Sequence, residues 1–325
     1  MEKKTVLVTG IGGNVGQGII RNIGKTCYPV KIIGTNIATP SAGTHLCDVF
    51  YQTPYSYEEN YIEKIIEICQ KEKVDLILPS TDYEVYYLAL NQKYLPTVVA
   101  SPANTAEIFL DKYKTWLHFV RHKLPFAETV LPSEYKSNFP EIIAKPREGR
   151  GSRGLFFNPK ETAQFDDAKY LIQRLYKGDE ITIAFYVTKE YNLHGFITLS
   201  RKLSDGATSQ CKVEKKYDDI IKPFLEQLIN SIQISGSCNV QAIITPDLMI
   251  RPFEVNCRIS GTNSIRSNFG FPDVKYALDE YLYNKPLKKP EIKEGAAIRI
   301  LMDVIYPGVK DFDEIFDKTS DHYLF

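Results

Sequence analysis

Residues 239–264, NVQAIITPDLMIRPFEVNCRISGTNS, decide the fold of this chain. Two apolar runs flank Pro246-Asp247, a pair typical of a turn, so the stretch predicts a β-hairpin. Side chains alternate between the two faces of a strand. One face of the second strand carries Phe253, Val255 and Cys257. The other face carries Glu254, Asn256 and Arg258. A turn centred on Pro246-Asp247 pairs Gln241 with position 252 and places it close to Glu254.

The hairpin therefore predicts a cluster of oxygen donors, Gln241, Glu254 and Asn256, with Arg258 beside it. Oxygen ligands suit Mg²⁺, which needs few protein groups when phosphates supply the others. The alternative is the solvated face of a sheet. Three aligned oxygen donors and an adjacent arginine favour a magnesium site.

Residues 142–154, IIAKPREGRGSRG, predict a strand that delivers Lys145 to a glycine-rich loop. The loop contains Gly149, Gly151 and Gly154, and also Arg147, Arg150 and Arg153. A lysine at a strand end, beside accessible backbone amides, suits a polyphosphate. The alternative is an exposed basic loop.

Residues 173–185, QRLYKGDEITIAF, read as a strand, a lysine-glycine turn and a second strand that begins near Glu180. The backbone of such a linker can hydrogen-bond a purine, and a carboxylate suits the hydroxyl groups of a ribose. A glutamate after a turn is also commonly solvated, so this signal is weak by itself.

The N-terminal part alternates strands and helices, which predicts a parallel sheet covered on both faces. The expected strands are residues 5–9, 30–35 and 74–80, and the expected helices are residues 15–24, 57–73 and 101–124. Gly10, Gly13 and Gly16 give a TGxxGxxG turn, which resembles the nucleotide loop of extended short-chain dehydrogenases. A dinucleotide site also needs an acidic residue at the end of the second strand, where this chain has Asn36. A structural or substrate-facing turn is therefore favoured.

Over residues 1–286 the chain resembles ATP-grasp enzymes, and most closely the short proteins similar to the carbamoyl-phosphate synthase large chain. LDKYKTW (residues 110–116) resembles the segment with the first nucleotide lysine, Lys112, and residues 239–264 resemble the metal and phosphate motif. The resemblance implies that nine residues bind ATP: Lys112, Lys145, Gly149, Gly151, Gly154, Gln173, Leu175, Tyr176 and Glu180. It implies that Mg²⁺ is held by Gln241, Glu254 and Asn256. It gives the catalytic roles to Arg258 and Lys145.

The implied fold is an α/β N-terminal domain followed by two α+β lobes that form an ATP-grasp fold. The N-terminal domain has a Rossmann-like parallel sheet, the pre-ATP-grasp domain. The expected boundaries are 1–104 for this domain, 105–175 for the small lobe with its lid loop, 176–286 for the large lobe with the metal site, and 287–325 for a C-terminal extension. Cys257 replaces the family's usual proline, and SGTNS (residues 260–264) replaces the synthase's serine-rich tail.

The implied activity is an ATP- and Mg²⁺-dependent ligase that forms a C–N bond and releases ADP. A carboxylate becomes an acyl phosphate, and an amine then displaces the phosphate. Asp82 and Glu84 could bind a cationic amine, and Arg201 could bind a carboxylate. The alternatives are a catalytically silent nucleotide-binding protein and an NAD(P)-dependent oxidoreductase or epimerase.

The composition limits the classes of binding partner that we expect for this protein. Lys plus Arg and Asp plus Glu number 40 each, which argues against a general nucleic-acid binder. The six cysteines form no CxxC pair and no zinc-type cluster, so they read as reduced thiols of the core. No stretch approaches the length of a membrane span or a signal peptide. We therefore expect a cytoplasmic protein with small-molecule substrates, no nucleic-acid or membrane partner, and a homodimer as the family-level expectation.

Overall fold

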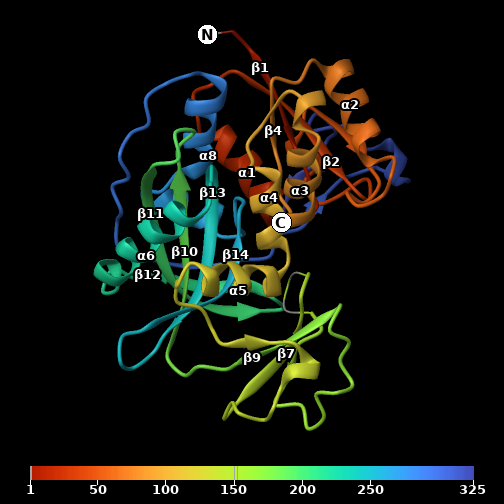
Figure 1. Ribbon diagram of the computed structural model, residues 1–325. Coiled ribbons are helices and arrows are strands. Elements are labelled where there is room, and N and C mark those ends of the chain that lie inside the picture. The colour runs from red at the N-terminus through yellow and green to blue at the C-terminus, as the bar shows by residue number, and fades with distance from the viewer. Residues whose placement is uncertain (1, 150, 152) are drawn as a thin grey trace.

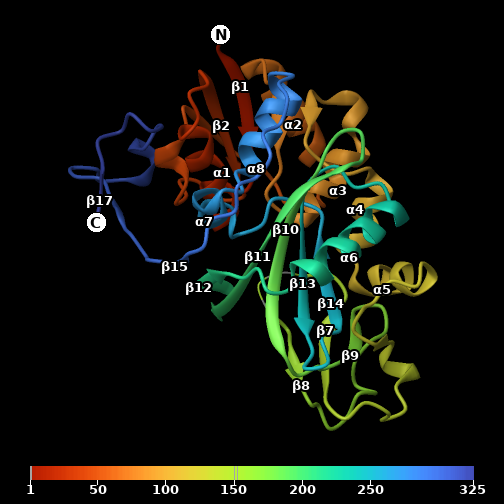
Figure 2. The same ribbon diagram turned by 90° about the vertical axis from the view of Figure 1, so that its left-hand side faces the viewer.

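The computed structural model describes the whole chain except residues 1, 150 and 152. An N-terminal domain lies beside a large lobe, and a small lobe projects from the opposite end (Figure 1). A C-terminal extension returns to the N-terminal domain (Figure 2).

The N-terminal domain is a five-stranded parallel sheet with the strand order β3-β2-β1-β4-β5. Its strands are β1 (Lys4–Val8), β2 (Val30–Asn36), β3 (Val49–Gln52), β4 (Leu76–Leu78) and β5 (Thr97–Val98). Its helices are α1 (Asn14–Gly24), α2 (Tyr61–Glu72) and α3 (Asp82–Leu90). Val6 and Val8 pack towards α1, and Leu7 packs towards α2, because helices cover both faces of the sheet. The predicted α/β unit is confirmed, and β3, β5 and α3 are additional elements.

Two helices replace the single helix expected over residues 101–124. They are α4 (Ala103–Leu110) and α5 (Lys112–Arg121). Asp111 interrupts them with φ −99° and ψ 114°, and its carboxylate accepts hydrogen bonds from the backbone N–H groups of Tyr113 and Lys114 at 2.8 and 3.2 Å. This is an N-terminal cap, which a carboxylate favours because it satisfies free N–H groups. The cap fixes Lys112 at the first position of α5.

The small lobe is a four-stranded antiparallel sheet with the order β6-β9-β7-β8. Its strands are β6 (Thr129–Val130), β7 (Ile142–Pro146), β8 (Phe156–Phe157) and β9 (Tyr170–Arg174). The strands β7 and β9 lie at the lower end of the molecule in Figure 1. Ile142, Ala144 and Ile172 form the small core of this lobe. The lid loop therefore begins on a strand that is anchored by its own core.

The large lobe contains a six-stranded antiparallel sheet with the order β14-β13-β10-β11-β12-β15. Its strands are β10 (Asp179–Val187), β11 (Leu193–Ser204), β12 (Ala207–Val213), β13 (Gly236–Ile244), β14 (Ile250–Asn256) and β15 (Ala296–Ile298). Its helices are α6 (Asp218–Ser231), α7 (Asn263–Arg266) and α8 (Asp273–Ala277). Strands β10, β13 and β14 run side by side through the middle of the view in Figure 2.

Strand β10 shows how the sheet is used on both faces. Ile183 and Phe185 point to the core that contains α6, whereas Ala184 and Tyr186 point to the core that contains α1 and α8. By the two-residue period, Thr182 lies on the same face as Ala184 and Tyr186. That face is therefore apolar under the N-terminal domain and becomes polar towards the start of β10.

The predicted hairpin is formed by β13 and β14, with a different turn and register. Gln241 pairs directly with Glu254 instead of with position 252, because a bulge lies between Gln241 and Ala242. The connection is also longer than a two-residue turn, since the N–H of Thr245 donates to the carbonyl oxygen of Met249 at 3.0 Å. The correction brings the two predicted oxygen ligands closer together than the sequence indicated.

The C-terminal extension joins two domains. Strand β15 pairs with β12, and the strands β16 (Val304–Ile305) and β17 (Tyr323–Leu324) form a separate pair. Lys318 contacts Asp48 of the N-terminal domain at 2.8 Å. Among the described residues, no helix is both long enough and apolar enough to cross a membrane.

Candidate active site

A cavity of about 550 Å³ lies where the large-lobe sheet meets the N-terminal domain. The strands β10, β13 and β14 form one side, and the turn after β1, residues 54–57 and the start of α3 form another. The lid loop and the turn between β11 and β12 form a third side. The predicted site residues that line this cavity are Asp82, Glu84, Gly151, Arg201, Gln241, Glu254, Asn256 and Arg258.

The polar residues of β14 are linked by hydrogen bonds. The amide Nδ2 of Asn256 donates to Oε1 of Glu254 at 3.0 Å, and Nη2 of Arg258 donates to Oδ1 of Asn256 at 2.9 Å. Gln241 accepts a hydrogen bond from Arg201 on β11. The predicted oxygen cluster is therefore assembled, and guanidinium groups border it on two sides.

Glu254 is held in its charged form. Burial raises the pKa of its carboxyl, but the charges of Lys112, Lys145 and Arg258, with the hydrogen bond from Asn256, outweigh burial and bring the pKa below its usual value. A buried carboxylate surrounded by cations is a suitable partner for a polyphosphate with a divalent cation.

Arg258 pairs with Asp82 of the N-terminal domain. Its Nη2 and Nε lie 2.7 and 3.0 Å from Oδ2 of Asp82. Burial acts to lower the pKa of Arg258, but Asp82 and Glu254 raise it above its usual value. Asp82 was expected to bind a cationic amine or to cap a helix, and the structure adds a third contact, because one of its oxygens is committed to the predicted phosphate-binding arginine.

Lys145 lies behind Glu254. It is 5% exposed, and its Nζ donates to the carbonyl oxygen of Phe253 at 2.9 Å. Burial and the nearby charge of Lys112 lower the pKa of Lys145 to about 7, although Glu254 opposes this shift. Perturbed lysines of this kind cluster at functional sites.

Lys112 connects the lid loop to the cluster. Its Nζ donates to the carbonyl oxygen of Gly149 at 3.3 Å, and its backbone N–H donates to the carbonyl oxygen of Arg147 at 2.9 Å. A small second cavity is lined by residues that include Lys112, Gly149, Glu254 and Asn256. The first nucleotide lysine, the lid and the predicted metal ligands therefore meet at one point.

The lid loop rests on the turn between β11 and β12. A Cβ atom on Gly206 would lie 2.3 Å from the carbonyl oxygen of Gly151, so only glycine allows this contact. Gly206 also has φ +72°, which other residues rarely adopt. Gly151 and Arg153 line the main cavity from the lid. Arg150 lies outside the described residues.

Several predicted residues are not among those that line the main cavity: Lys112, Lys145, Gly149, Gly154, Gln173, Leu175, Tyr176 and Glu180. Of these, Lys112 and Gly149 line the small cavity beside it. The amide Nε2 of Gln173 donates to Thr129 at 2.9 Å inside the small lobe, so its side chain is not directed to a ligand. The N–H of Leu175 donates to the carbonyl oxygen of Glu141 at 2.9 Å. Glu180 lies 3.2 Å from Arg201, which brings the predicted ribose residue and the predicted carboxylate-binding residue together.

Glu84 has a structural role that the sequence did not indicate. Its Oε2 accepts hydrogen bonds from Thr9 at 2.7 Å and from the N–H of Thr81 at 3.0 Å, and the hydroxyl of Thr81 caps the N–H of Glu84. This reciprocal capping box fixes the start of α3. Burial raises the pKa of Glu84, and the hydrogen bonds oppose the shift. The expectation that Glu84 is a free amine-binding carboxylate is therefore not supported.

The glycine turn after β1 faces the cavity through Gly10 and Gly13. Gly10 has φ +59°, and a Cβ there would lie 2.3 Å from Oγ of Ser80, so the turn requires glycine. The side chain of Asn36 accepts a hydrogen bond from the N–H of Gly12 at 3.2 Å. The residue at the end of the second strand therefore holds the turn itself, which argues against a ribose-binding acid and a dinucleotide.

Three tyrosines of the cavity, Tyr55, Tyr57 and Tyr83, were missed by sequence reasoning. Tyr83 directly follows Asp82, but no motif marks any of the three. Among the described residues, no group of three or more His, Cys, Asp or Glu side chains could hold a metal ion by itself. The donor set with one carboxylate and two amides fits Mg²⁺ when phosphate oxygens complete the coordination.

Comparisons with known proteins agree with this architecture. Residues 109–262 match the family model of the ATP-grasp domain, and residues 6–98 match the model of the PylC-like, N-terminal domain. N5-carboxyaminoimidazole synthetase from Staphylococcus aureus, complexed with ADP, has a TM-score of 0.75 at 12% identity and covers 92% of this chain and 82% of its own.

Two further solved structures are similar. The biotin carboxylase domain dimer of Hydrogenobacter thermophilus 2-oxoglutarate carboxylase, in complex with MgADP, ADP and bicarbonate, has a TM-score of 0.72 at 14% identity, covering 97% of this chain and 76% of that one. N5-carboxyaminoimidazole ribonucleotide synthetase from Thermotoga maritima has a TM-score of 0.71 at 14% identity. The match covers 93% of this chain and 84% of that one. At these identities the likeness establishes the fold, and the predicted architecture is confirmed. Residues 109–262 therefore form an ATP-grasp domain, and residues 6–98 precede it as a PylC-like N-terminal domain.

Proposed function

We propose that the protein is an ATP- and Mg²⁺-dependent carboxylate–amine ligase that acts through an acyl phosphate and releases ADP. One observation carries the proposal: the hydrogen-bonded series Glu254, Asn256, Arg258 and Asp82 runs from the predicted metal site to the N-terminal domain. ATP would bind at the Glu254 end of this series. The second substrate would bind at the Asp82 end, in the part of the main cavity that the N-terminal domain lines. The solved relatives that contain ADP share this arrangement of domains.

The charges of this site suit phosphoryl transfer. Lys112, Lys145 and the lid amides would hold the phosphates of ATP, and Arg258 would neutralise the charge that develops on the transferring group. Gln241, Glu254 and Asn256 would hold Mg²⁺, which supplies charge neutralisation between the phosphates. The ionised state of Glu254 supports this role.

The reaction would have two balanced steps. A carboxylate oxygen attacks the γ-phosphorus of ATP, the bond to the β-phosphate oxygen breaks, and ADP leaves. An amine then attacks the acyl carbon, inorganic phosphate leaves, and the amine loses a proton. The lid loop would exclude water, which otherwise hydrolyses the acyl phosphate.

Asp82 could position the amine in the second step. Both hydrogen bonds from Arg258 go to Oδ2, and within the described part of the chain Oδ1 has no hydrogen-bond partner. A carboxylate with one oxygen on the phosphate-binding arginine and one towards the cavity can hold an amine next to the acyl phosphate. We propose this role for Asp82, and a homodimer and a cytoplasmic location stay predictions.

The test is ADP release from Mg·ATP across a panel of carboxylates that includes bicarbonate, acetate, benzoate and the common amino acids, with ammonium and methylamine as amines. We expect at least one carboxylate to raise ADP release, and Arg258→Met to abolish the increase. Arg121→Met is the matched control, because Arg121 is exposed on α5 outside the described lining of the cavity. If Mg·ATP binds but ADP release responds to no carboxylate, the silent nucleotide-binding alternative is favoured.

A further inference from the structure

Three tyrosine rings form a wall of the main cavity, which we name the tyrosine wall: Tyr55, Tyr57 and Tyr83. The rings of Tyr55 and Tyr57 are stacked, with centroids 5.2 Å apart and an interplanar angle of 11°. The ring of Tyr57 meets the ring of Tyr83 edge-on at 6.0 Å. The rings come from residues 54–57 and from α3, so two elements of the N-terminal domain build the wall.

The tyrosine wall is not part of the hydrophobic core. Tyr55 is 42% exposed and Tyr57 is 55% exposed, although both lie beside the buried cluster of the site. Aromatic faces that remain open to a cavity offer a stacking surface to a planar group. No part of the phosphoryl-transfer chemistry proposed above uses these rings.

The position of the wall relative to the charged residues defines what could bind there. Tyr83 directly follows Asp82 in α3, and Asp82 holds Arg258 at 2.7 Å. The lining of the same cavity also includes Arg153, Arg201 and Arg258. A ligand that reaches from the arginines to the rings therefore has an anionic end and a planar end.

The lid loop contacts this wall at Tyr83. The hydroxyl of Tyr83 donates to Oε2 of Glu148 at 2.9 Å, and Glu148 belongs to the loop that follows β7. A group on the wall would thus lie near the lid loop and in the same cavity as Arg258, the proposed phosphate-binding arginine. The lining continues outward from Tyr55. Ile37, Pro54 and Tyr55 also line another cavity of about 630 Å³, which we name the outer cavity.

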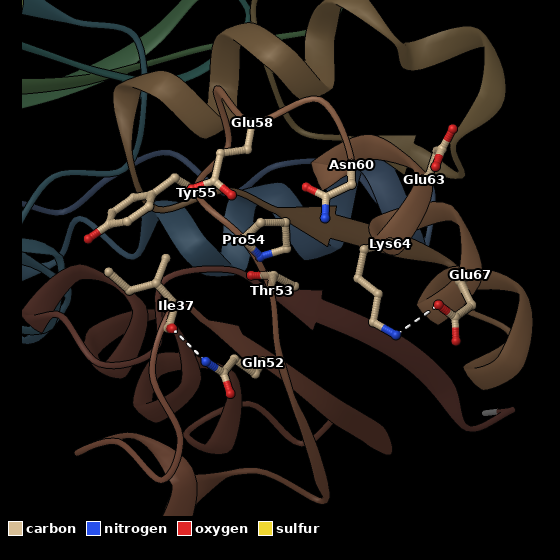
Figure 3. Close-up of a pocket in the computed structure, with 10 residues that line it drawn as sticks. All are labelled: Ile37, Gln52, Thr53, Pro54, Tyr55, Glu58, Asn60, Glu63, Lys64 and Glu67. Atoms are coloured by element: carbon tan, nitrogen blue, oxygen red, sulfur yellow. Dashed lines mark hydrogen bonds and ion pairs between the residues drawn. The ribbon is translucent and has the colours of Figure 1, made fainter.

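Figure 3 shows Tyr55 and Ile37 at one end of this outer cavity, and the ion pair of Lys64 with Glu67 at the other. The outer cavity gives room for a substituent beyond the ring. An unsubstituted short carboxylate would leave both the wall and the outer cavity without contacts.

We propose that the carboxylate substrate carries a planar ring, which stacks on the outer face of the Tyr55–Tyr57 pair while its carboxylate reaches Arg258. The proposal rests on the proposed ligase function and adds the substrate class. Stacking on the wall selects planar over puckered rings, because only a planar ring brings all its atoms into contact with a flat aromatic face. The gain from aromatic stacking corresponds to about fivefold to tenfold in affinity.

The test is isothermal titration of the full chain with benzoate, nicotinate and indole-3-carboxylate, compared with cyclohexanecarboxylate and hexanoate. Each titration is made with and without Mg·ADP. We expect the planar acids to bind about fivefold to tenfold more tightly than the two aliphatic acids. Tyr55→Ala and Tyr57→Ala should each remove this preference, whereas Tyr55→Phe and Tyr57→Phe should keep it.

Tyr94→Ala is the matched control, because Tyr94 is a 60% exposed tyrosine of the same domain that is not among the residues lining the described cavities. Tyr83→Phe separates the ring from its bond to the lid and should keep the preference for planar acids. The proposal is overturned if planar and puckered acids bind equally, if none of the five acids binds, or if Tyr55→Ala keeps the preference. If Mg·ADP does not bind, the ligase function is contradicted and not the stacking proposal. The titrations without nucleotide then still show whether planar acids bind to the tyrosine wall.

Discussion

Replacing Lys145 by methionine should stabilise the nucleotide-free protein, and increasingly so as the pH falls. Burial lowers the pKa of Lys145 from 10.5 to about 7. Between these values the unfolded chain binds one proton more than the folded chain, so the stability of the parent protein rises with pH in this window. Below pH 7 both states are protonated, and the full cost of the buried charge is present.

The magnitude follows from the shift. One pKa unit corresponds to about 1.4 kcal/mol. With a shift from 10.5 to about 7, the buried lysine lowers the free energy of unfolding by about 5 kcal/mol at pH 6 and by only about 2 kcal/mol at pH 9. The stability advantage of Lys145→Met should therefore be about 3 kcal/mol larger at pH 6 than at pH 9. Lys112, Arg258 and the hydrogen bond from Asn256 still act on Glu254 in the variant and favour its charged form.

The assay is urea unfolding at the two pH values in the presence of a chelator and without nucleotide. Lys114→Met is the control: Lys114 is exposed and paired with Glu107 at 2.5 Å, which raises its pKa, so it stays charged in both states. The same Lys145→Met protein should bind Mg·ATP about tenfold more weakly or worse, because a charged hydrogen bond to phosphate is lost. A stability difference that is equal at both pH values, or a variant less stable than the parent at pH 6, would refute the reasoning.

Three further substitutions test two other parts of the site and one buried ion pair of the large lobe. Asp82→Asn leaves the buried Arg258 without its counter-charge and should cost about 1–3 kcal/mol in urea unfolding, together with a loss of carboxylate-dependent ADP release; unchanged values in both would contradict the proposed pairing. Arg266→Met breaks a fully buried pair with Asp273 and should cost about 3–5 kcal/mol, whereas the double variant with Asp273→Leu should recover most of the loss; an equally unstable double variant would show that the pair is not the cause. Gly206→Ala places a Cβ against the lid backbone at φ +72°, so thermal shift should show weaker stabilisation by Mg·ATP; stabilisation equal to the parent would show that the lid does not depend on this contact.

The sequence predicted those parts of the site that lie on one strand or at one spacing. Glu254 and Asn256 alternate on β14, and Arg258 follows two residues after Asn256, so that periodicity alone placed the three on one face. The bulge after Gln241 was not visible, because a bulge depends on the pairing of two strands and not on the pattern of one. The parallel sheet and the glycine turn were likewise readable from alternation and spacing.

Contacts between distant segments could not be predicted in this way. Asp82 and Arg258 are 176 positions apart, and only packing of the N-terminal domain against β14 brings them together. The capping role of Glu84 was hidden for a similar reason, since Thr9, the residue after β1, completes its hydrogen bonds. The tyrosine wall depends on the fold of residues 54–57 against α3, and single tyrosines carry no motif.

The central claim is that the cluster around Glu254 holds Mg·ATP, and calorimetric titration of the parent protein and of Glu254→Gln tests it most directly. We expect one Mg·ATP per chain, an affinity that falls without Mg²⁺, and a loss of about tenfold or more in Glu254→Gln, since a charged ligand is replaced by a neutral amide of the same shape. NAD⁺ and NADPH should not bind. Binding of NAD⁺ or NADPH without Mg·ATP, or Mg·ATP affinity unchanged in Glu254→Gln, would contradict the account.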